Sequence, residues 1–353
     1  MAKARGPGTL PTIADVAAAA GVSTATVSRC LNAPGRVRAD TRARVEAAVA
    51  ALGYLPDAGA RSLAARATRT IGAVVPTIEN AIFAEGLQAF EETLTAHGMT
   101  LLVASSRYRR DEEEAKIRTL LARRVDGLLL IGFDRSEAIL AECDRRGVRT
   151  IVAWAAEPGQ RQVAAGFDNF AAMGDMTRAV LDHGHRRLTM IAGVNAGNDR
   201  ARRRVEGARA AVAAWPGGGV DLDVVEAAYG VAQGRAAFAS LMDRTPRPTA
   251  ILCGNDVLAV GALAEARARG LDVPGDVSIT GFDDIEIARI VDPPLATVHV
   301  PHREMGRRAA LSLIEMIETG GDVESVTLAT DLRLRGTLGP VPGVRRAVPP
   351  TDD

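Results

Sequence analysis

The chain has 353 residues, of which 47% are hydrophobic and 3% aromatic, so it is long enough to form more than one domain around a sizeable core. Its 43 basic and 43 acidic residues cancel, yet 10 of the basic and only 4 of the acidic residues lie within residues 1–70. A basic amino-terminal segment on an acidic body is typical of a protein in which one domain binds nucleic acid.

The composition also excludes several classes of protein. No apolar segment follows Lys3 and Arg5, so no signal peptide is predicted, and no uncharged apolar run approaches the roughly 20 residues of a membrane span. Cys30, Cys143 and Cys253 are scattered, which predicts free thiols in a reducing compartment. We therefore expect a cytoplasmic protein with no membrane association, no bound metal and no cofactor.

The first predicted element is a pair of short helices separated by a glycine. Thr12 is a candidate N-cap of the first helix, whose apolar residues recur at helical spacing until Gly21 ends it. Ser23 is a candidate cap of the second helix, whose Val27 and Leu31 are expected to point inward. The outer face of this second helix carries small and polar residues and a single basic one. This pattern predicts a helix-turn-helix.

A third helix is predicted next, with Asp40 as its N-cap and with Val45, Val49 and Leu52 on its inner face, ending at Gly53.

The segment 56–69 has a different character. It is rich in alanine and arginine and holds Leu63 as its only sizeable apolar residue. A helix with so little surface to bury is marginal alone, so we expect it to form only with a partner.

From residue 70 onward, short apolar segments alternate with amphipathic ones. This alternation predicts parallel sheets covered by helices on both faces, and the number of units suits two lobes better than one. The predicted strands cover 70–75, 100–104, 127–131, 149–153, 188–192, 250–253 and 277–280. The predicted helices cover 84–96, 112–123, 136–145, 169–182, 199–214, 231–242 and 257–269.

The segment from Thr12 to Asn32 resembles the DNA-binding headpiece of the lactose-repressor (LacI/GalR) family. The similarity continues through Leu-Gly-Tyr-Leu-Pro at 52–56 and Ala-Arg-Ser-Leu at 60–63, and it extends in order and spacing to about Gly336. The resemblance implies an all-α helix-turn-helix headpiece joined to an α/β body with doubly wound parallel sheets. This body would have two lobes, like a periplasmic binding protein of type I.

The resemblance also implies a domain organisation. It comprises a disordered tail at 1–10, a helix-turn-helix domain at 11–55, a hinge helix or linker at 56–69, an effector-binding and dimerisation domain at 70–340, and a tail at 341–353. In the body, one lobe is expected at about 70–167 and 298–328, and the other at about 168–297 and 329–340.

The family pattern assigns the DNA contacts. Thr24, Ala25 and Arg29 occupy base-facing positions, and Arg29 can fork onto guanine O6 and N7. Leu63 matches the wedge that enters the minor groove at the operator centre. The remaining predicted DNA contacts, chiefly to phosphates, are Ser23, Thr26, Ser28, Asn32 and Arg61.

Six residues match effector-binding positions of the family, each where a strand ends. They combine two rings, two acids, a guanidinium and an amide, which suits a small polyhydroxylated molecule. They are Phe83, Asp168, Arg204, Tyr229, Asn255 and Asp283. A structural interpretation stays open for several of them: Phe83 as core, Asp168 and Asp283 as helix caps, and Arg204 as a surface charge.

The predicted function is a transcriptional regulator, in most such cases a repressor, that binds a pseudo-palindromic operator in double-stranded DNA as a homodimer. Its effector is predicted to be a sugar or sugar acid, because the strings around residues 83 and 166–170 are similar to the gluconate-repressor branch and Arg204 suits a carboxylate. A purine held between Phe83 and Tyr229 is the alternative. A pure sugar-binding protein is disfavoured by the headpiece.

An enzyme is disfavoured because no GxSxG, Walker or strand-linked GxGxxG motif occurs. His183 and His185 match a structural feature of the family at a helix-to-strand junction and do not predict a metal site.

Overall fold

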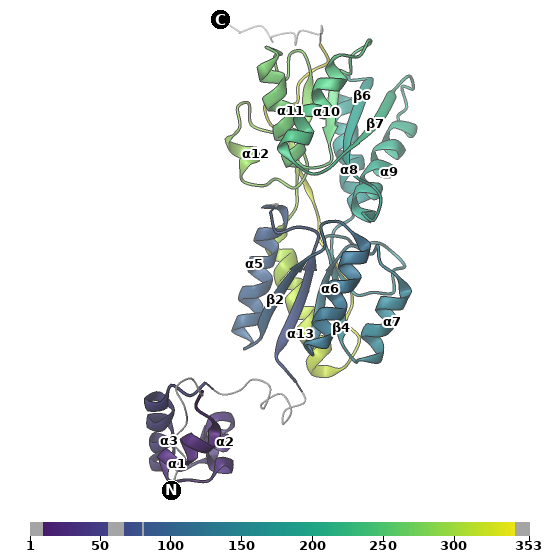
Figure 1. Ribbon diagram of the computed structural model, residues 1–353. Coiled ribbons are helices and arrows are strands. Elements are labelled where there is room, and N and C mark those ends of the chain that lie inside the picture. Colours follow the sequence, from purple (N-terminus) through teal and green to yellow (C-terminus); the bar gives the residue numbers. More distant parts are fainter. Residues whose placement is uncertain (1–9, 56–66, 80, 343–353) are drawn as a thin grey trace, which may run out of the picture. The chain divides into compact units, whose positions relative to one another are not determined.

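The computed structural model describes residues 10–55, 67–79 and 81–342. The chain divides into two compact units, Met1–Thr68 and Arg69–Asp353, which we call the headpiece and the body (Figure 1). Arg61 and Leu63, two of the predicted DNA contacts, lie outside the described residues. Helices of the described segments lack the combination of length and apolar content that a membrane span requires.

The headpiece elements are α1 (Ile13–Ala20), α2 (Thr24–Asn32), the 3-10 turn η1 (Pro34–Arg36) and α3 (Ala39–Leu52). The body helices are α5 (Ala81–Ala96), α6 (Arg110–Ala122), α7 (Glu137–Arg145), α8 (Asn169–Asp182), α9 (Asp199–Ala213), α10 (Val231–Met242), α11 (Asp256–Ala268), α12 (Ile287–Ile290) and α13 (His302–Thr319). The body strands are β1 (Thr70–Val75), β2 (Thr100–Ser105), β3 (Gly127–Ile131), β4 (Arg149–Ala153), β5 (Ala164–Gly166), β6 (Arg187–Gly193), β7 (Asp221–Ala227), β8 (Ala250–Cys253), β9 (Ser278–Thr280), β10 (Thr297–His299), β11 (Val326–Thr327) and β12 (Asp331–Arg333).

The first two helices begin and end where the sequence predicts. The backbone amide of Thr12 donates to the Asp15 carboxylate at 2.7 Å, and Gly21 ends α1 in the left-handed conformation that glycine adopts without strain. The Ser23 hydroxyl accepts from the Thr26 amide at 3.2 Å and caps α2. Val27 of α2 is fully buried in a small core with residues of α1 and α3.

Two expectations for the third helix are wrong. Arg38, not Asp40, is the N-cap of α3. Asp40 lies in the first turn, where its negative charge interacts favourably with the positive end of the helix dipole. Leu52 is 38% exposed, whereas Ala48 is buried one turn earlier on the inner face. The helix therefore begins before the residue with the strongest capping preference, and its last turn projects beyond the small core.

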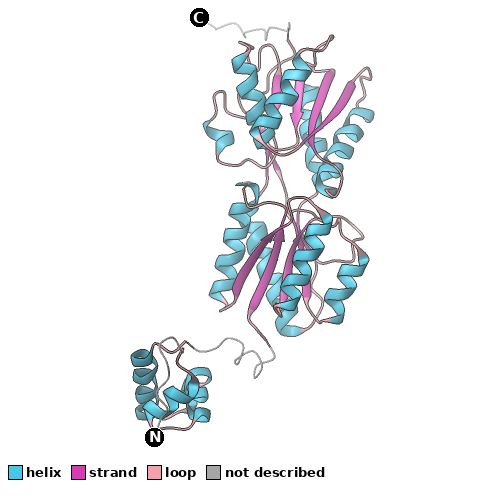
Figure 2. Cartoon of the chain, viewed as in Figure 1, coloured by secondary structure: helices cyan, strands magenta, loops and turns pink. Residues whose placement is uncertain are grey.

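Lobe 1 of the body is built on a six-stranded sheet with the order β11-β5-β4-β3-β1-β2. All of its neighbouring strands pair in parallel. Helices α5 and α13 pack together against this sheet, and α6 and α7 also pack together (Figure 2). Strands β1 and β3 are buried along almost their whole length, as the apolar runs predict for a sheet covered on both faces.

Lobe 2 has a four-stranded parallel sheet with the order β7-β6-β8-β9. Helices α8 and α9 form one packed pair and α10 and α11 the other. The chain crosses between the lobes from β5 to α8, from β10 to α13, and from β11 to β12. Strands β10 and β12 pair antiparallel as the second and third crossing segments.

The sequence analysis missed several strands. Strand β7 escapes it because Asp221, Asp223 and Glu226 interrupt its apolar residues, as an edge strand exposed to water permits. Strands β5, β10, β11 and β12 have only two or three residues each, too few for a periodic signal.

Candidate functional site

The outer face of α2 is the candidate DNA-reading surface. Thr24, Ala25 and Arg29 are exposed on it, and the side chain of Arg29 makes no hydrogen bond or ion pair with a described residue. The buried Val27 and Cys30 lie on the opposite face, so core packing fixes which side chains α2 presents. A guanidinium held in this way is available for a base edge.

The remaining predicted residues of α2 take part in the local structure. The Ser23 and Thr26 hydroxyls lie 2.9 Å apart at the cap, and the Asn32 amide donates to Ser28 Oγ at 3.3 Å. A phosphate oxygen accepts a hydrogen bond, so the contact needs a free hydroxyl hydrogen. Ser28 keeps its hydrogen, and so does whichever of Ser23 and Thr26 accepts from the other.

The body carries a second candidate site, at which Asp283 follows strand β9. Asp283 is fully buried, and neither of its carboxylate oxygens has a hydrogen-bond partner among the described residues. Burial raises the pKa of Asp283 to about 7, although the charges of Arg204 and Arg200 oppose this shift. A buried acceptor without a partner is costly, so Asp283 is a candidate for binding donors of a ligand.

Arg204 is buried next to Asp283 and is not the surface charge that one interpretation allowed. Its Nη2 lies 3.6 Å from Asp283 Oδ1, and its guanidinium covers the Phe282 ring at 3.6 Å. Its Nε donates to Asn169 Oδ1 at 2.8 Å, and its Nη1 donates to the Gly254 carbonyl at 2.6 Å. The Nε and Nη1 donors of Arg204 are therefore already bound to acceptors of the protein.

Aromatic side chains from both lobes meet at the candidate site. The ring of Tyr108, between β2 and α6, lies 5.6 Å from that of Tyr229, which follows β7, at an angle of 45°. The Tyr229 ring lies directly over Gly193, where an added Cβ would come 2.2 Å from the ring. Burial raises the pKa of Tyr108, so its phenol stays a neutral hydrogen-bonding group.

Phe83 belongs to a second aromatic group, on lobe 1. Its ring meets Trp154 edge to face at 5.2 Å, and Trp154 lies 6.2 Å from the His302 ring. Trp154 Nε1 and both His302 ring nitrogens are buried without described partners, and burial lowers the pKa of His302 to about 4. Phe83 is almost completely buried, so it acts here as core that supports Trp154.

Two predicted residues cap helices. Asp168 Oδ1 accepts from the amides of Phe170 and Ala171 at the start of α8, which supports the structural interpretation of this carboxylate. Asn255 Oδ1 accepts from the Leu258 amide at the start of α11, but its buried Nδ2 has no described partner. Asn255 therefore combines a capping oxygen with a donor that remains for a ligand.

A continuous series of contacts connects these residues. Phe83 contacts Trp154, whose carbonyl accepts from Asn169 Nδ2 at 3.0 Å, and Asn169 in turn accepts from Arg204, which lies beside Asp283. The structure therefore brings together Phe83, Arg204 and Asp283 from both lobes.

The sequence analysis missed Tyr108, Trp154, Asn169 and His302. Three residues of the site show a backbone signal that no motif carries: φ is 59° at Tyr108, 61° at Trp154 and 106° at Asp283. Such angles in residues other than glycine are uncommon and concentrate at functional sites.

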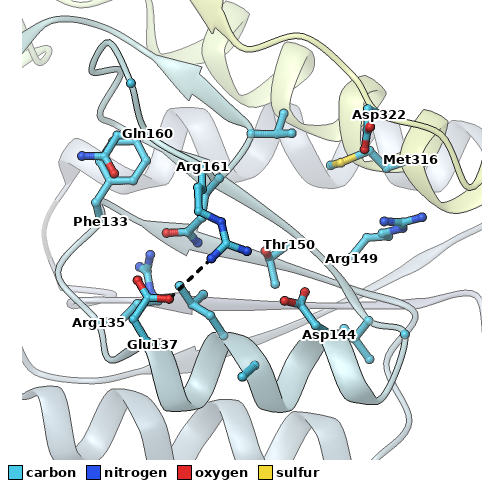
Figure 3. Close-up of a pocket in the computed structure, with 17 residues that line it drawn as sticks. Phe133, Arg135, Glu137, Asp144, Arg149, Thr150, Gln160, Arg161, Met316 and Asp322 are labelled. Atoms are coloured by element: carbon cyan, nitrogen blue, oxygen red, sulfur yellow. Dashed lines mark ion pairs between the residues drawn. The ribbon is translucent and has the colours of Figure 1, made fainter.

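Lobe 1 also holds a separate basin of about 760 Å³ that includes residues of α7 and β4 (Figure 3). Charges of both signs surround it, and Arg161 reaches toward Glu137 at 3.9 Å. Because the opposite charges offset one another, the basin has no preference for an ion of either sign.

His185 has the structural role that the sequence predicts. It is completely buried, and its ring nitrogens lie 3.0 Å from Thr249 Oγ1, 3.1 Å from Ser278 Oγ and 3.0 Å from the Gly339 carbonyl. It thereby fixes the last crossing segment on lobe 2.

Two family models match this chain, one in the headpiece and one in the body. The model of the lacI family of bacterial regulatory proteins matches residues 12–57, and that of the periplasmic binding protein-like domain matches residues 177–338. The chain is 34% identical over 349 residues to the HTH-type transcriptional repressor CytR of Escherichia coli (strain K12), covering 96% of this chain and 100% of that protein. It is 34% identical to the HTH-type transcriptional repressor PurR of Proteus mirabilis (strain HI4320), covering 87% of this chain and 91% of that protein.

A solved structure of a LacI-family transcriptional regulator from Silicibacter pomeroyi superimposes with a TM-score of 0.85 at 28% identity, covering 93% of this chain and 99% of that one. These similarities confirm the predicted fold class, a helix-turn-helix headpiece with a two-lobed, periplasmic-binding-protein-like body. The chain belongs to the lacI family of bacterial regulatory proteins, and it is a DNA-binding transcriptional regulator and not an enzyme.

Proposed function

We propose that this regulator binds a pseudo-palindromic operator as a homodimer, and that a small molecule bound between the two lobes controls this binding. The observation that carries the proposal is the buried carboxylate of Asp283, which has no hydrogen-bond partner among the described residues and lies beside aromatic rings contributed by both lobes. A ligand that spans the lobes changes their relative positions, which is how binding in the body would reach the headpiece.

The exposed face of α2 would read the operator. Arg29 would bind guanine O6 and N7 in the major groove, and Thr24 would contact an adjacent base edge. Ala25 is too small to read more than shape. Ser23, Thr26, Ser28 and Asn32 would hold phosphates, and Arg61 and Leu63 of the segment 56–69 would contribute at the operator centre.

Uncovered apolar surface on both lobes supports a homodimer. Strand β2 is the edge of the lobe 1 sheet, and its Val103 is 47% exposed. On lobe 2, Val231 and Ile290 are 44% and 75% exposed. An open, apolar strand edge invites pairing with another chain, and two identical subunits would match the two half-sites of a pseudo-palindrome.

The effector that suits the site best is a neutral molecule rich in hydroxyl groups. Asp283 offers two acceptors and Asn255 Nδ2 one donor, while Tyr108 and Tyr229 offer ring faces for an apolar side of the ligand. Arg204 already donates to Asn169 and to the Gly254 carbonyl, so its fork is less available for the carboxylate of a sugar acid. A neutral sugar is thus favoured over a sugar acid.

A flat heterocycle of the purine type is the second candidate, because the two tyrosine rings come from opposite lobes and would enclose it.

Two experiments test the proposal. A mobility-shift titration of the full chain on DNA from upstream of its own gene tests operator binding against a scrambled duplex. A thermal-shift screen of sugars, sugar acids and purines identifies the effector, since a ligand at 100 times its dissociation constant stabilises the folded state by about 2.7 kcal/mol. No preference for the upstream DNA at any ligand concentration would contradict the operator proposal.

A further inference from the structure

The arginine-rich start of helix α9, residues 199–204, makes most of the described polar contacts between the lobes. Its sequence, Asp-Arg-Ala-Arg-Arg-Arg, looks like a solvated helix face. In the structure, four of these six side chains reach the segment after β3 or the segment after β4 of lobe 1.

Two of the contacts are buried and use backbone groups of lobe 1. The Phe133 amide donates to Asp199 Oδ2 at 2.6 Å, and Arg200 Nη1 donates to the Ile131 carbonyl at 3.0 Å. Arg200 also donates to Asp199 Oδ1 at 2.9 Å, so the two side chains act as one unit. Separation of the lobes removes the lobe 1 partner from each of them.

Two further contacts lie nearer the surface. Arg202 binds Asp134 with both arms of its fork, at 2.6 and 2.8 Å, and the Arg202 hydrogen bond is the main reason that the pKa of Asp134 is lowered. Arg203 Nε lies 3.5 Å from Glu157 Oε1. The forked pair with Asp134 has the better geometry of the two.

Gly132 is required for this arrangement. Its φ is 71°, and an added Cβ would lie 2.0 Å from Arg200 Nη1 and 2.3 Å from Asp199 Oδ1. A side chain at position 132 would therefore displace the Asp199 and Arg200 side chains from their contacts with lobe 1, and the positive φ also favours glycine.

We propose that Asp199, Arg200 and Arg202 of lobe 2, with Ile131, Phe133 and Asp134 of lobe 1, form an interlobe clasp that sets the equilibrium between closed and open lobes. Each contact exists only when the lobes are closed, so the clasp raises the closed population. Arg200 belongs to the clasp and also lies next to the candidate effector site, because it lines the same small cavity as Tyr108. The regulatory consequence rests on the proposed function, whereas the closure equilibrium itself does not.

The test is a distance measurement on the full chain without added ligand or DNA. Spin labels at Glu137 of lobe 1 and Asp243 of lobe 2, which are 85% and 68% exposed, report the lobe separation by double electron–electron resonance. Arg202→Gln should reduce the closed-to-open ratio about threefold to tenfold, and raising the salt from 0.05 to 0.5 M should act in the same direction.

Three variants make the result specific. The matched control is Arg244→Gln, because Arg244 is 42% exposed and pairs with Asp223 inside lobe 2, whereas Arg202 is 40% exposed and pairs across the lobes. This control should leave the distance distribution unchanged. The charge exchange Arg202→Asp with Asp134→Arg should restore closure, and Gly132→Ala should open the lobes further than Arg202→Gln.

An unchanged distance distribution in Arg202→Gln, or no recovery in the charge exchange, overturns the clasp. Failure of Gly132→Ala to fold does not affect these two outcomes. If the lobes open as expected but operator titrations of Arg202→Gln and the wild type coincide, the clasp stands and the proposed control of operator binding by lobe closure is wrong.

Discussion

The guanidinium of Arg204 lies 3.6 Å from the carboxylate of Asp283, yet burial raises the pKa of Asp283 to about 7. Desolvation of the carboxylate therefore outweighs the attraction of the neighbouring cation. Near neutral pH, Asp283 is divided between a neutral acid that donates one hydrogen bond and an anion that only accepts.

This relationship predicts a pH-dependent stability. The Asp283 pKa is raised in the folded state, so the unfolded chain loses this proton near pH 4 and the folded chain near pH 7. Protonation of Asp283 adds to the free energy of unfolding in full below pH 4. This addition is lost between pH 4 and 7, by up to about 1.4 kcal/mol per pH unit. Asp283→Asn should therefore match the wild type at low pH and exceed it in stability at pH 8, as measured by urea unfolding.

His302 affects the stability in the opposite direction. Burial lowers its pKa to about 4 in the folded state, so as the pH falls from 6.5 to about 4 the unfolded chain binds this proton before the folded chain does, and the folded state loses stability. Asp256, whose pKa burial also raises, acts in the same direction as Asp283. The comparison must therefore be the difference between wild type and Asp283→Asn at each pH. A constant difference from pH 4 to 8 would contradict the raised pKa of Asp283.

Arg29 should contribute sequence specificity. Arg29→Ala is expected to weaken operator binding by about 1–3 kcal/mol and to relax the preference for one base pair in each half-site. Binding of the effector, which the thermal-shift assay measures, should not change. Equal loss of affinity for operator and scrambled DNA would instead make Arg29 a phosphate contact.

The crossing of α5 and α13 should be sensitive to one added methyl group. A Cβ on Gly306 would lie 1.9 Å from the Gly86 carbonyl oxygen, so Gly306→Ala should destabilise the body by about 1–3 kcal/mol in thermal unfolding. Gly174→Ala in α8 is the matched control, because the nearest atoms to its added Cβ lie 3.5 Å away and alanine favours a helix. Similar melting temperatures for the two variants would contradict the close approach.

Leu63 should contribute to the choice of operator rather than to general affinity for DNA. If two wedges open the central base step, Leu63→Ala should lose much of the preference for the operator over a scrambled duplex. Nonspecific binding and its salt dependence should hardly change, because basic residues on phosphates provide them. Titrations at two salt concentrations test this, and an unchanged specificity ratio would leave the segment 56–69 as a tether.

The parts that could be predicted from the sequence depend on local signals. Thr12 and Ser23 lie next to the helices they cap, and β1, β3 and β8 are continuous apolar runs. The sequence favours Asp40 as the cap of α3, but the helix begins after Arg38, a residue with a weak capping preference. Element type was thus easier to predict than element ends.

The effector site was harder to predict, because its residues come from separate segments. Tyr108, Trp154 and His302 have no common spacing in the sequence. The fold of lobe 1 places Trp154 beside His302, and Tyr108 meets Tyr229 of lobe 2. Arg200 lies in a run of charged residues. A solvated helix and a helix in contact with the other lobe can both have such a run, so the sequence does not predict the contact of Arg200 with Ile131. The family positions identified Arg204 and Asp283, but the occupied fork of Arg204 became clear only from its hydrogen bonds.

Under the proposed function, a ligand at Asp283 controls binding of α2 to the operator. The most direct test of this control is a fluorescence-anisotropy titration of labelled operator with wild type and Asp283→Ala, each with and without a saturating concentration of the effector found by thermal shift. The effector should change the operator affinity of the wild type by about 5–150-fold, the range typical of such coupling. Asp283→Ala should bind the operator like the effector-free wild type and should not respond to effector. A full response in Asp283→Ala would show that the effector acts without this carboxylate.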